Sequence, residues 1–173
     1  MSEDSLSKNS VVVIAALLAA AQAIAGTGTP PVVDINWAKE GQTLVQGTHR
    51  FADTSGSLIP FAVSFQQQFP YSTCTLDGTT PTFQAKQLPI GRTLFLKPTR
   101  TPRGAIHLDI QAEDTEVRSV KSTEHGACIS MSPVTGGLPA TTLSVDLPDH
   151  GATTISFPDG HYALTLRVRI DSE

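Results

Sequence analysis

The residues best suited to chemistry are four acids close together in the chain, Asp109, Glu113, Asp114 and Glu116. Carboxylate oxygens are hard ligands, and acids in a loop between two strands suit Ca²⁺. The spacing lacks the Asp-x-Asp-x-Asp-Gly register of a calcium loop. The alternative interpretation is therefore a solvated acidic loop that binds no metal.

Other catalytic and metal-binding patterns are missing from the sequence. The chain has no GxSxG, HExxH, P-loop or GxGxxG motif. No two of the histidines have the spacing of a zinc pair; they are His49, His107, His125, His150 and His161. Paired glycosidase carboxylates meet only in the fold, but the chain is poor in aromatic residues that would bind sugars. We therefore expect a protein that is not an enzyme and needs no cofactor.

Cys74 and Cys128 are the only two cysteines. They form no CxxC motif, and neither has a histidine nearby in the sequence that would activate a thiolate. If the chain is exported, as the N-terminal segment described below predicts, an even pair of cysteines predicts one structural disulfide. Because it would close a loop of about 54 residues, we expect it to stabilise the fold by roughly 3–4 kcal/mol.

A binding site for a carbohydrate or another small ligand would have to lie on loops. Two segments are candidates, Phe69-Pro70-Tyr71 and Gly136-Gly137, and both also suit ordinary connections. Tyr71 is the candidate ligand-binding residue.

The N-terminal part contains an uncharged apolar segment, residues 11–25, followed by Gly, Thr and Pro. Such a segment is typical of a secretory signal peptide. Ala23-Ile24-Ala25 fits the small-x-small cleavage rule, which would leave Gly26 first; Ala21-Gln22-Ala23 is a second candidate site. The preceding residues include Glu3 and Asp4 as well as Lys8. An uncleaved membrane anchor or a buried helix therefore stay open as alternatives.

The rest of the chain has the pattern of a β protein. Residues 26–31 form a linker, and residues 32–173 are of ordinary size for one domain. Apolar and polar residues alternate over residues 58–65, 105–112, 141–147 and 162–170, which predicts strands with one buried face. The turns Asp149-His150-Gly151 and Asp159-Gly160 predict a three-stranded meander over residues 141–170, and Asp77-Gly78 predicts another hairpin.

In all, we expect nine to eleven short strands and an all-β fold, an antiparallel β-sandwich of immunoglobulin-like or jelly-roll-like type behind an N-terminal signal helix. Trp37 lies in the first strand and outside the cysteine loop, which departs from the Cys–Trp–Cys order of immunoglobulin domains. The net charge of −4 with scattered Lys and Arg excludes a nucleic-acid footprint.

These features predict an exported protein of a bacterial envelope, periplasmic or extracellular, that acts by contact with another envelope or surface protein. We expect it to be associated with a membrane only if residues 11–25 are not cleaved off. A carbohydrate- or ligand-binding module is the alternative of a different class.

The last 14 residues, with Gly160 before a long alternating strand, resemble the C-terminal strand of chaperone–usher pilus subunits. The resemblance implies a subunit whose C-terminal strand is bound by an assembly chaperone, and whose groove is later filled by a neighbour's N-terminal extension.

Overall fold

The computed structural model describes residues 30–169, which form eight strands. The expected signal segment 1–25 and most of the linker lie outside the described residues. In chain order the strands are β1 (Val32–Lys39), β2 (Gln42–His49), β3 (Phe61–Asp77), β4 (Thr80–Arg100), β5 (Ile106–His125), β6 (Cys128–Asp146), β7 (Gly151–Ser156) and β8 (Tyr162–Arg169).

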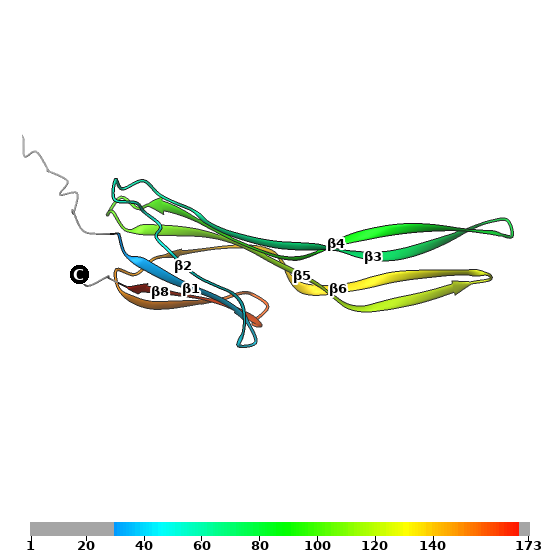
Figure 1. The fold of residues 1–173 in the computed structure, drawn as a ribbon. Coiled ribbons are helices and arrows are strands. Elements are labelled where there is room, and N and C mark those ends of the chain that lie inside the picture. Colours follow the sequence, from blue (N-terminus) through cyan, green and yellow to red (C-terminus); the bar gives the residue numbers. More distant parts are fainter. Residues whose placement is uncertain (1–29, 170–173) are drawn as a thin grey trace, which may run out of the picture.

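The strands form two antiparallel sheets (Figure 1). The small sheet has the order β2-β1-β8-β7, and the large sheet has the order β3-β4-β5-β6. The described part contains no helix. The prediction of an all-β antiparallel fold is therefore confirmed for the described residues.

One buried core joins the two sheets. The small sheet contributes alternate residues of β1 and β8, among them Trp37, Leu164 and Leu166, which are fully buried. The large sheet contributes Leu94 and Ile110 with their neighbours. The alternation predicted for residues 162–170 is confirmed over residues 162–169, because every second side chain of β8 faces this core.

The strands of the large sheet are much longer than those of the small sheet. β3 to β6 have 17 to 21 residues, whereas the small sheet has strands of six to eight. At about 3.3 Å per residue, the long strands span roughly 55–70 Å. They extend far beyond the small sheet, as Figure 1 shows. We call residues 67–90 and 116–136, which make up this extension, the arm, and the remaining described residues the body.

The number and length of the strands were predicted wrongly. Eight strands replace the expected nine to eleven, and four of them are long. Residues 141–147 are not the first strand of a meander, since residues 141–146 end β6 in the large sheet. The turn Asp149-His150-Gly151 carries the chain from one sheet to the other. The hairpins at Asp77-Gly78 and Asp159-Gly160 are confirmed.

Three segments expected in loops lie in strands. Phe69-Pro70-Tyr71 is part of β3, Gly136-Gly137 is part of β6, and the acidic residues 113–116 are part of β5. No alternation marks the first two segments, because both of their faces lie largely outside the core. The β5 segment was missed because the buried position that follows Ala112 is the charged Asp114.

Candidate protein-binding arm

The arm begins at one row of residues across the large sheet. Gln66 of β3 pairs with Gly91 of β4, Gly91 pairs with Thr115 of β5, and Thr115 pairs with Gly137 of β6. The pairing of β4 with β5 ends at this row. Beyond it, the large sheet continues as two hairpins, β3–β4 and β5–β6.

Two glycines allow this row to form. Gly91 has φ +137° and Gly137 has φ +114°, which L side chains rarely adopt. A Cβ at Gly91 would lie 2.0 Å from the Phe65 carbonyl oxygen, and one at Gly137 would lie 1.9 Å from the Asp114 carbonyl oxygen. Only glycine fits where the backbones approach this closely.

A buried carboxylate lies beside the row. Asp114 is the one charged residue that is buried among residues 30–169. The Tyr162 hydroxyl donates a hydrogen bond to its Oδ2 at 2.8 Å, and Arg92 Nε lies 3.4 Å from its Oδ1. Burial and the nearby Asp114 carboxylate raise the pKa of Tyr162 above its usual range, so the hydroxyl stays a donor. The contact ties β8 of the body to the start of the arm.

A second contact from the body reaches the first residue of the arm on β5. Lys39 Nζ donates a hydrogen bond to Glu116 Oε1 at 2.6 Å and lies 5.6 Å from the centre of the Tyr162 ring. The hydrogen bond from Lys39 lowers the pKa of Glu116. Arg118 Nε lies 3.8 Å from the same carboxylate. These contacts fix the base of the arm on the body.

The two hairpins of the arm are joined near the tip by the predicted disulfide. Cys74 of β3 and Cys128 of β6 are bonded, with 5.5 Å between their Cα atoms, so the disulfide prediction is confirmed. Ser130 reinforces the link, because its Oγ accepts a hydrogen bond from the Cys74 N–H and donates one to the Cys74 carbonyl oxygen. Among the described arm residues, the buried hydrophobic ones are only Ile90, beside the row, and Cys128. The arm is therefore held by strand pairing and the disulfide rather than by a core.

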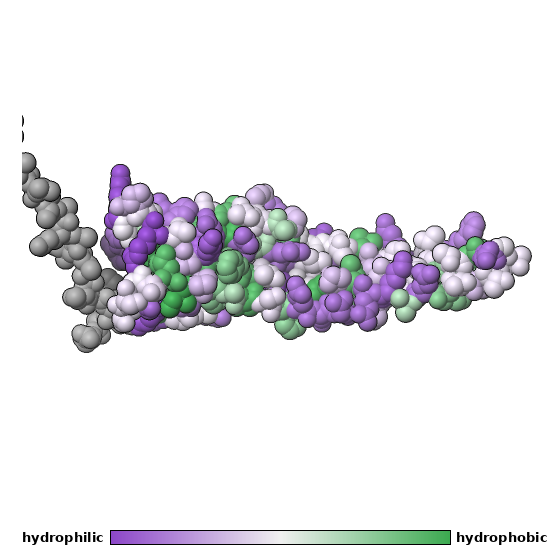
Figure 2. Space-filling view, turned by 90° about the horizontal axis from the view of Figure 1, so that it is seen from above, coloured by the Kyte–Doolittle hydropathy of each residue, from purple (hydrophilic) through white to green (hydrophobic). Residues whose placement is uncertain are grey.

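Large hydrophobic side chains are exposed along the arm. Of the six such residues in the described part, Ile59 lies on the body and Phe65 at the base of the arm; the other four lie on the arm and are Phe83, Val120, Ile129 and Met131. Figure 2 shows hydrophobic residues, in green, scattered among polar ones along the narrow end of the molecule. Surface like this, with no core beneath it, suits a protein-binding role.

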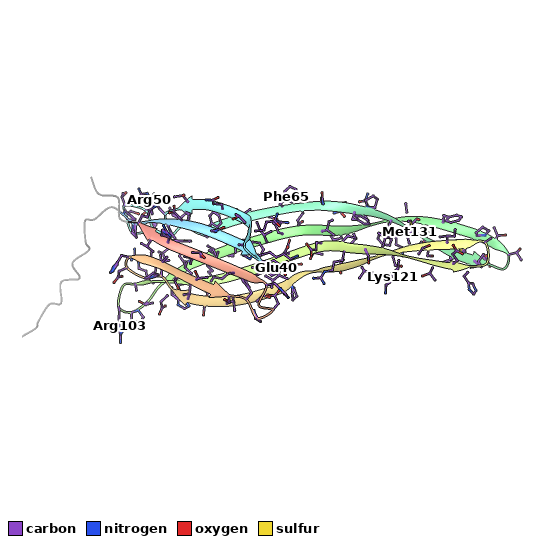
Figure 3. The ribbon with its side chains drawn as sticks, turned by 90° about the horizontal axis from the view of Figure 1, so that it is seen from below. Glu40, Arg50, Phe65, Arg103, Lys121 and Met131 are labelled. Atoms are coloured by element: carbon purple, nitrogen blue, oxygen red, sulfur yellow. A yellow bond between two sulfur atoms is a disulfide. The ribbon has the colours of Figure 1, made fainter. Side chains whose placement is uncertain are left out.

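Three of these residues share one face of the β5–β6 hairpin. Ile129, Met131 and Pro133 alternate along β6, and Val120 lies directly opposite Pro133. Cys128 and Ser130 occupy alternate positions of β6, and their side chains point the other way, toward β3. We call Val120, Ile129, Met131 and Pro133 the outer stripe. Figure 3 shows where Met131 and Lys121 lie on the arm.

The structure does not bring the four candidate calcium ligands together. All four lie in β5, but odd and even positions of a strand point to opposite faces. Asp114 and Glu116 contact the cations described above, whereas Asp109 lies 3.7 Å from His107. Within residues 30–169, no group of three or more His, Cys, Asp or Glu side chains is placed to hold a metal ion.

The candidate ligand-binding residue Tyr71 is half-buried in β3, opposite Lys86. A hollow of about 660 Å³ lies instead at the end of the body, between the 53–56 loop, Arg100 and Leu147. Two of its charged side chains have partners within the loop: the Asp53 carboxylate accepts hydrogen bonds from the Ser55 and Ser57 N–H groups, and Arg100 donates to the Gly56 carbonyl oxygen. The Ser55 hydroxyl is the main reason that the pKa of Asp53 is lowered.

Comparisons with protein-family models, with curated proteins and with solved structures find no match to this chain. Across residues 30–169, no helix is long and apolar enough to span a membrane.

The sequence reasoning did not identify the arm. A usable signal was present at Cys128, which follows the turn Gly126-Ala127 directly and so lies at the tip of a hairpin. A disulfide from that tip to Cys74, just before Asp77-Gly78, requires two hairpin ends to lie together.

Proposed function

We propose that this protein is an exported, non-enzymatic protein that acts by contact with another envelope or surface protein, and that the outer stripe of its arm is the contact surface. The observation that carries the proposal is an arm that lacks its own core and yet exposes Val120, Ile129 and Met131 on one face. Burying such side chains against a partner is favourable, at about 25 cal/mol per Å² of apolar surface.

Two further observations support the proposal, the first its non-enzymatic part and the second export. The one buried acid in the described residues, Asp114, is held by Tyr162 and Arg92 rather than facing a cavity. The disulfide at the arm tip is compatible with an oxidising compartment. We also propose that the body is a β-sandwich, supported by the core that both sheets share.

A photo-crosslinking amino acid at Met131 tests the contact surface in cells that make the protein. We expect a covalent adduct with one other protein, lost when Ile129 is changed to Asp, because a charge on the stripe disfavours its burial. The same crosslinker at Gln111, an exposed residue on β5 of the body, is the control. Adducts at Gln111 and none at Met131 would contradict the proposal.

Export is tested separately by sequencing the N-terminus of the protein recovered from the envelope or medium. Gly26 at the front supports cleavage and release, whereas Met1 or Ser2 supports a protein anchored through residues 11–25. Protein found only in the cytoplasm would contradict the export part of the proposal.

A further inference from the structure

Strand β4 has an unpaired edge along the arm. Its residues 80–90 pair with β3 on one side, and the pairing with β5 on the other side ends at Gly91. Residues 82–87 are all exposed, so neither of their faces is covered. An unpaired edge of N–H and C=O groups is a template for another strand.

Two prolines limit the part of this edge that can pair. Pro81 lies opposite Leu76 and Pro89 lies opposite Gln68. Proline has no N–H, so it suits strand positions whose nitrogen points away from the paired strand. The nitrogens of Pro81 and Pro89 therefore point to the open edge. Successive N–H groups of a strand point alternately to its two sides, so those of residues 83, 85 and 87 also point to the open edge. The prolines therefore enclose a short segment with three available donors.

The segment is complementary to itself. Pro81 and Pro89 are equally far from Ala85, so an antiparallel second copy with Ala85 opposite Ala85 places each proline opposite the other proline. In the same register Phe83 lies opposite Gln87, and each of the three pairs exchanges two N–H···O bonds. A two-fold axis through the Ala85 pair relates the two copies.

Charge and burial favour this register. Lys86 would lie opposite Gln84, so no two like charges face each other directly. The arm carries as many cations as anions, namely Lys86, Arg118 and Lys121 against Asp77, Glu116 and Glu124. Phe83, which is 60% exposed, would be covered in part by the partner's strand.

We propose that two copies of this chain pair edge to edge through residues 83–87 of β4, forming a continuous β3-β4-β4-β3 sheet. This dimer goes beyond the proposed function, because the β4 edge lies outside the outer stripe. A dimer can form whether or not the stripe binds another protein.

Sedimentation equilibrium of the full chain tests the dimer with a matched pair of proline variants. Ala85→Pro removes the two central N–H···O bonds but leaves the β3–β4 ladder intact, so we expect the dimer dissociation constant to rise about tenfold or more. Ser122→Pro is the control. Ser122 lies on β5 opposite Met131 of β6, two residues from Val120, which lies opposite Pro133. Like Val120, it therefore has an N–H group that points away from β6, so proline there leaves the β5–β6 ladder intact. We expect it to leave the dimer unchanged.

A second variant keeps the test valid if Ala85→Pro disturbs the arm. In the proposed register the two Ala85 Cα atoms lie about 5.5 Å apart. Ala85→Cys should therefore be joined between copies by a short thiol crosslinker, whereas Ser122→Cys should not. A monomeric wild-type chain, a dimer unaffected by Ala85→Pro, or equal crosslinking of both cysteine variants overturns the proposal.

Discussion

The hydroxyl of Tyr162 donates a hydrogen bond to the buried carboxylate of Asp114 across 48 residues of sequence, at 2.8 Å. Tyr162 begins β8 of the small sheet, and Asp114 precedes the row at which the large sheet divides. The bond therefore connects the core of the body with the base of the arm. The ring centres of Trp37 and Tyr162 lie 6.0 Å apart, so the Tyr162 ring packs against Trp37 in the core.

Changing Tyr162 to Phe should destabilise the protein by about 1–3 kcal/mol, because the buried Asp114 carboxylate loses a hydrogen-bond donor. Chemical denaturation of the full chain measures this change in the free energy of unfolding. The double variant with Asp114→Asn is the control, since removal of the charge should recover part of the loss. A Tyr162→Phe variant as stable as the wild type would show that the hydrogen bond does not hold the base of the arm.

The same contact predicts a loss of stability at high pH. The unfolded chain releases the phenolic proton of Tyr162 near its ordinary pKa of 10.0, whereas the folded chain has a raised pKa and keeps the proton. Above that pH the unfolded state binds fewer protons, so the free energy of unfolding falls as the pH rises.

The contribution of the Tyr162 hydroxyl to stability is therefore measured as the difference in the free energy of unfolding between the wild type and Tyr162→Phe. Free energies of unfolding of the wild type and Tyr162→Phe should converge between about pH 10 and pH 12. Curves that stay parallel over that interval would contradict the raised pKa.

Hydrophobic periodicity predicted the parts of the chain that pack against the core and missed the parts that do not. Trp37 and alternate residues of β8 face the core, so their periodicity predicted the buried face correctly. The region around Gln66, Gln67 and Gln68 has no buried face, so it carries no periodicity although it is strand. For the same reason, hydrophobic periodicity did not indicate that β4 and β5 continue into the arm.

The acidic cluster shows a different limit. Its four residues are close in sequence, but β5 directs them to two faces and gives them separate partners. The buried Asp114 carboxylate accepts its hydrogen bond from Tyr162, which is 48 positions away, and no local pattern in the sequence links the two residues. The disulfide was predictable because the chain has only two cysteines, so only one pairing within the chain is possible.

Removing the disulfide should loosen the arm and leave the body intact. The arm has almost no buried hydrophobic residues to replace the Cys74–Cys128 link, whereas the body keeps its core. In Cys74→Ser/Cys128→Ser we expect faster amide hydrogen exchange in residues 67–90 and 116–136, with unchanged protection around Leu164 and Ile110. Ser130→Ala, which keeps the disulfide, is the control and should show a smaller effect near Cys74. Uniform loss of protection throughout the chain would contradict this prediction.

Gly91 and Gly137 should tolerate no side chain. Gly91→Ala and Gly137→Ala each combine a positive φ with a Cβ about 2 Å from a carbonyl oxygen, so each should destabilise the protein by more than the roughly 1–2 kcal/mol of the φ strain alone. Gly104→Ala is the matched control, because Gly104 has φ +85° and no atom within 4 Å of the added Cβ. Thermal and chemical denaturation of the three variants separates the two effects. If all three lose equal stability, the close approach of the backbones at the dividing row contributes nothing, and the strain at positive φ accounts for the glycines by itself.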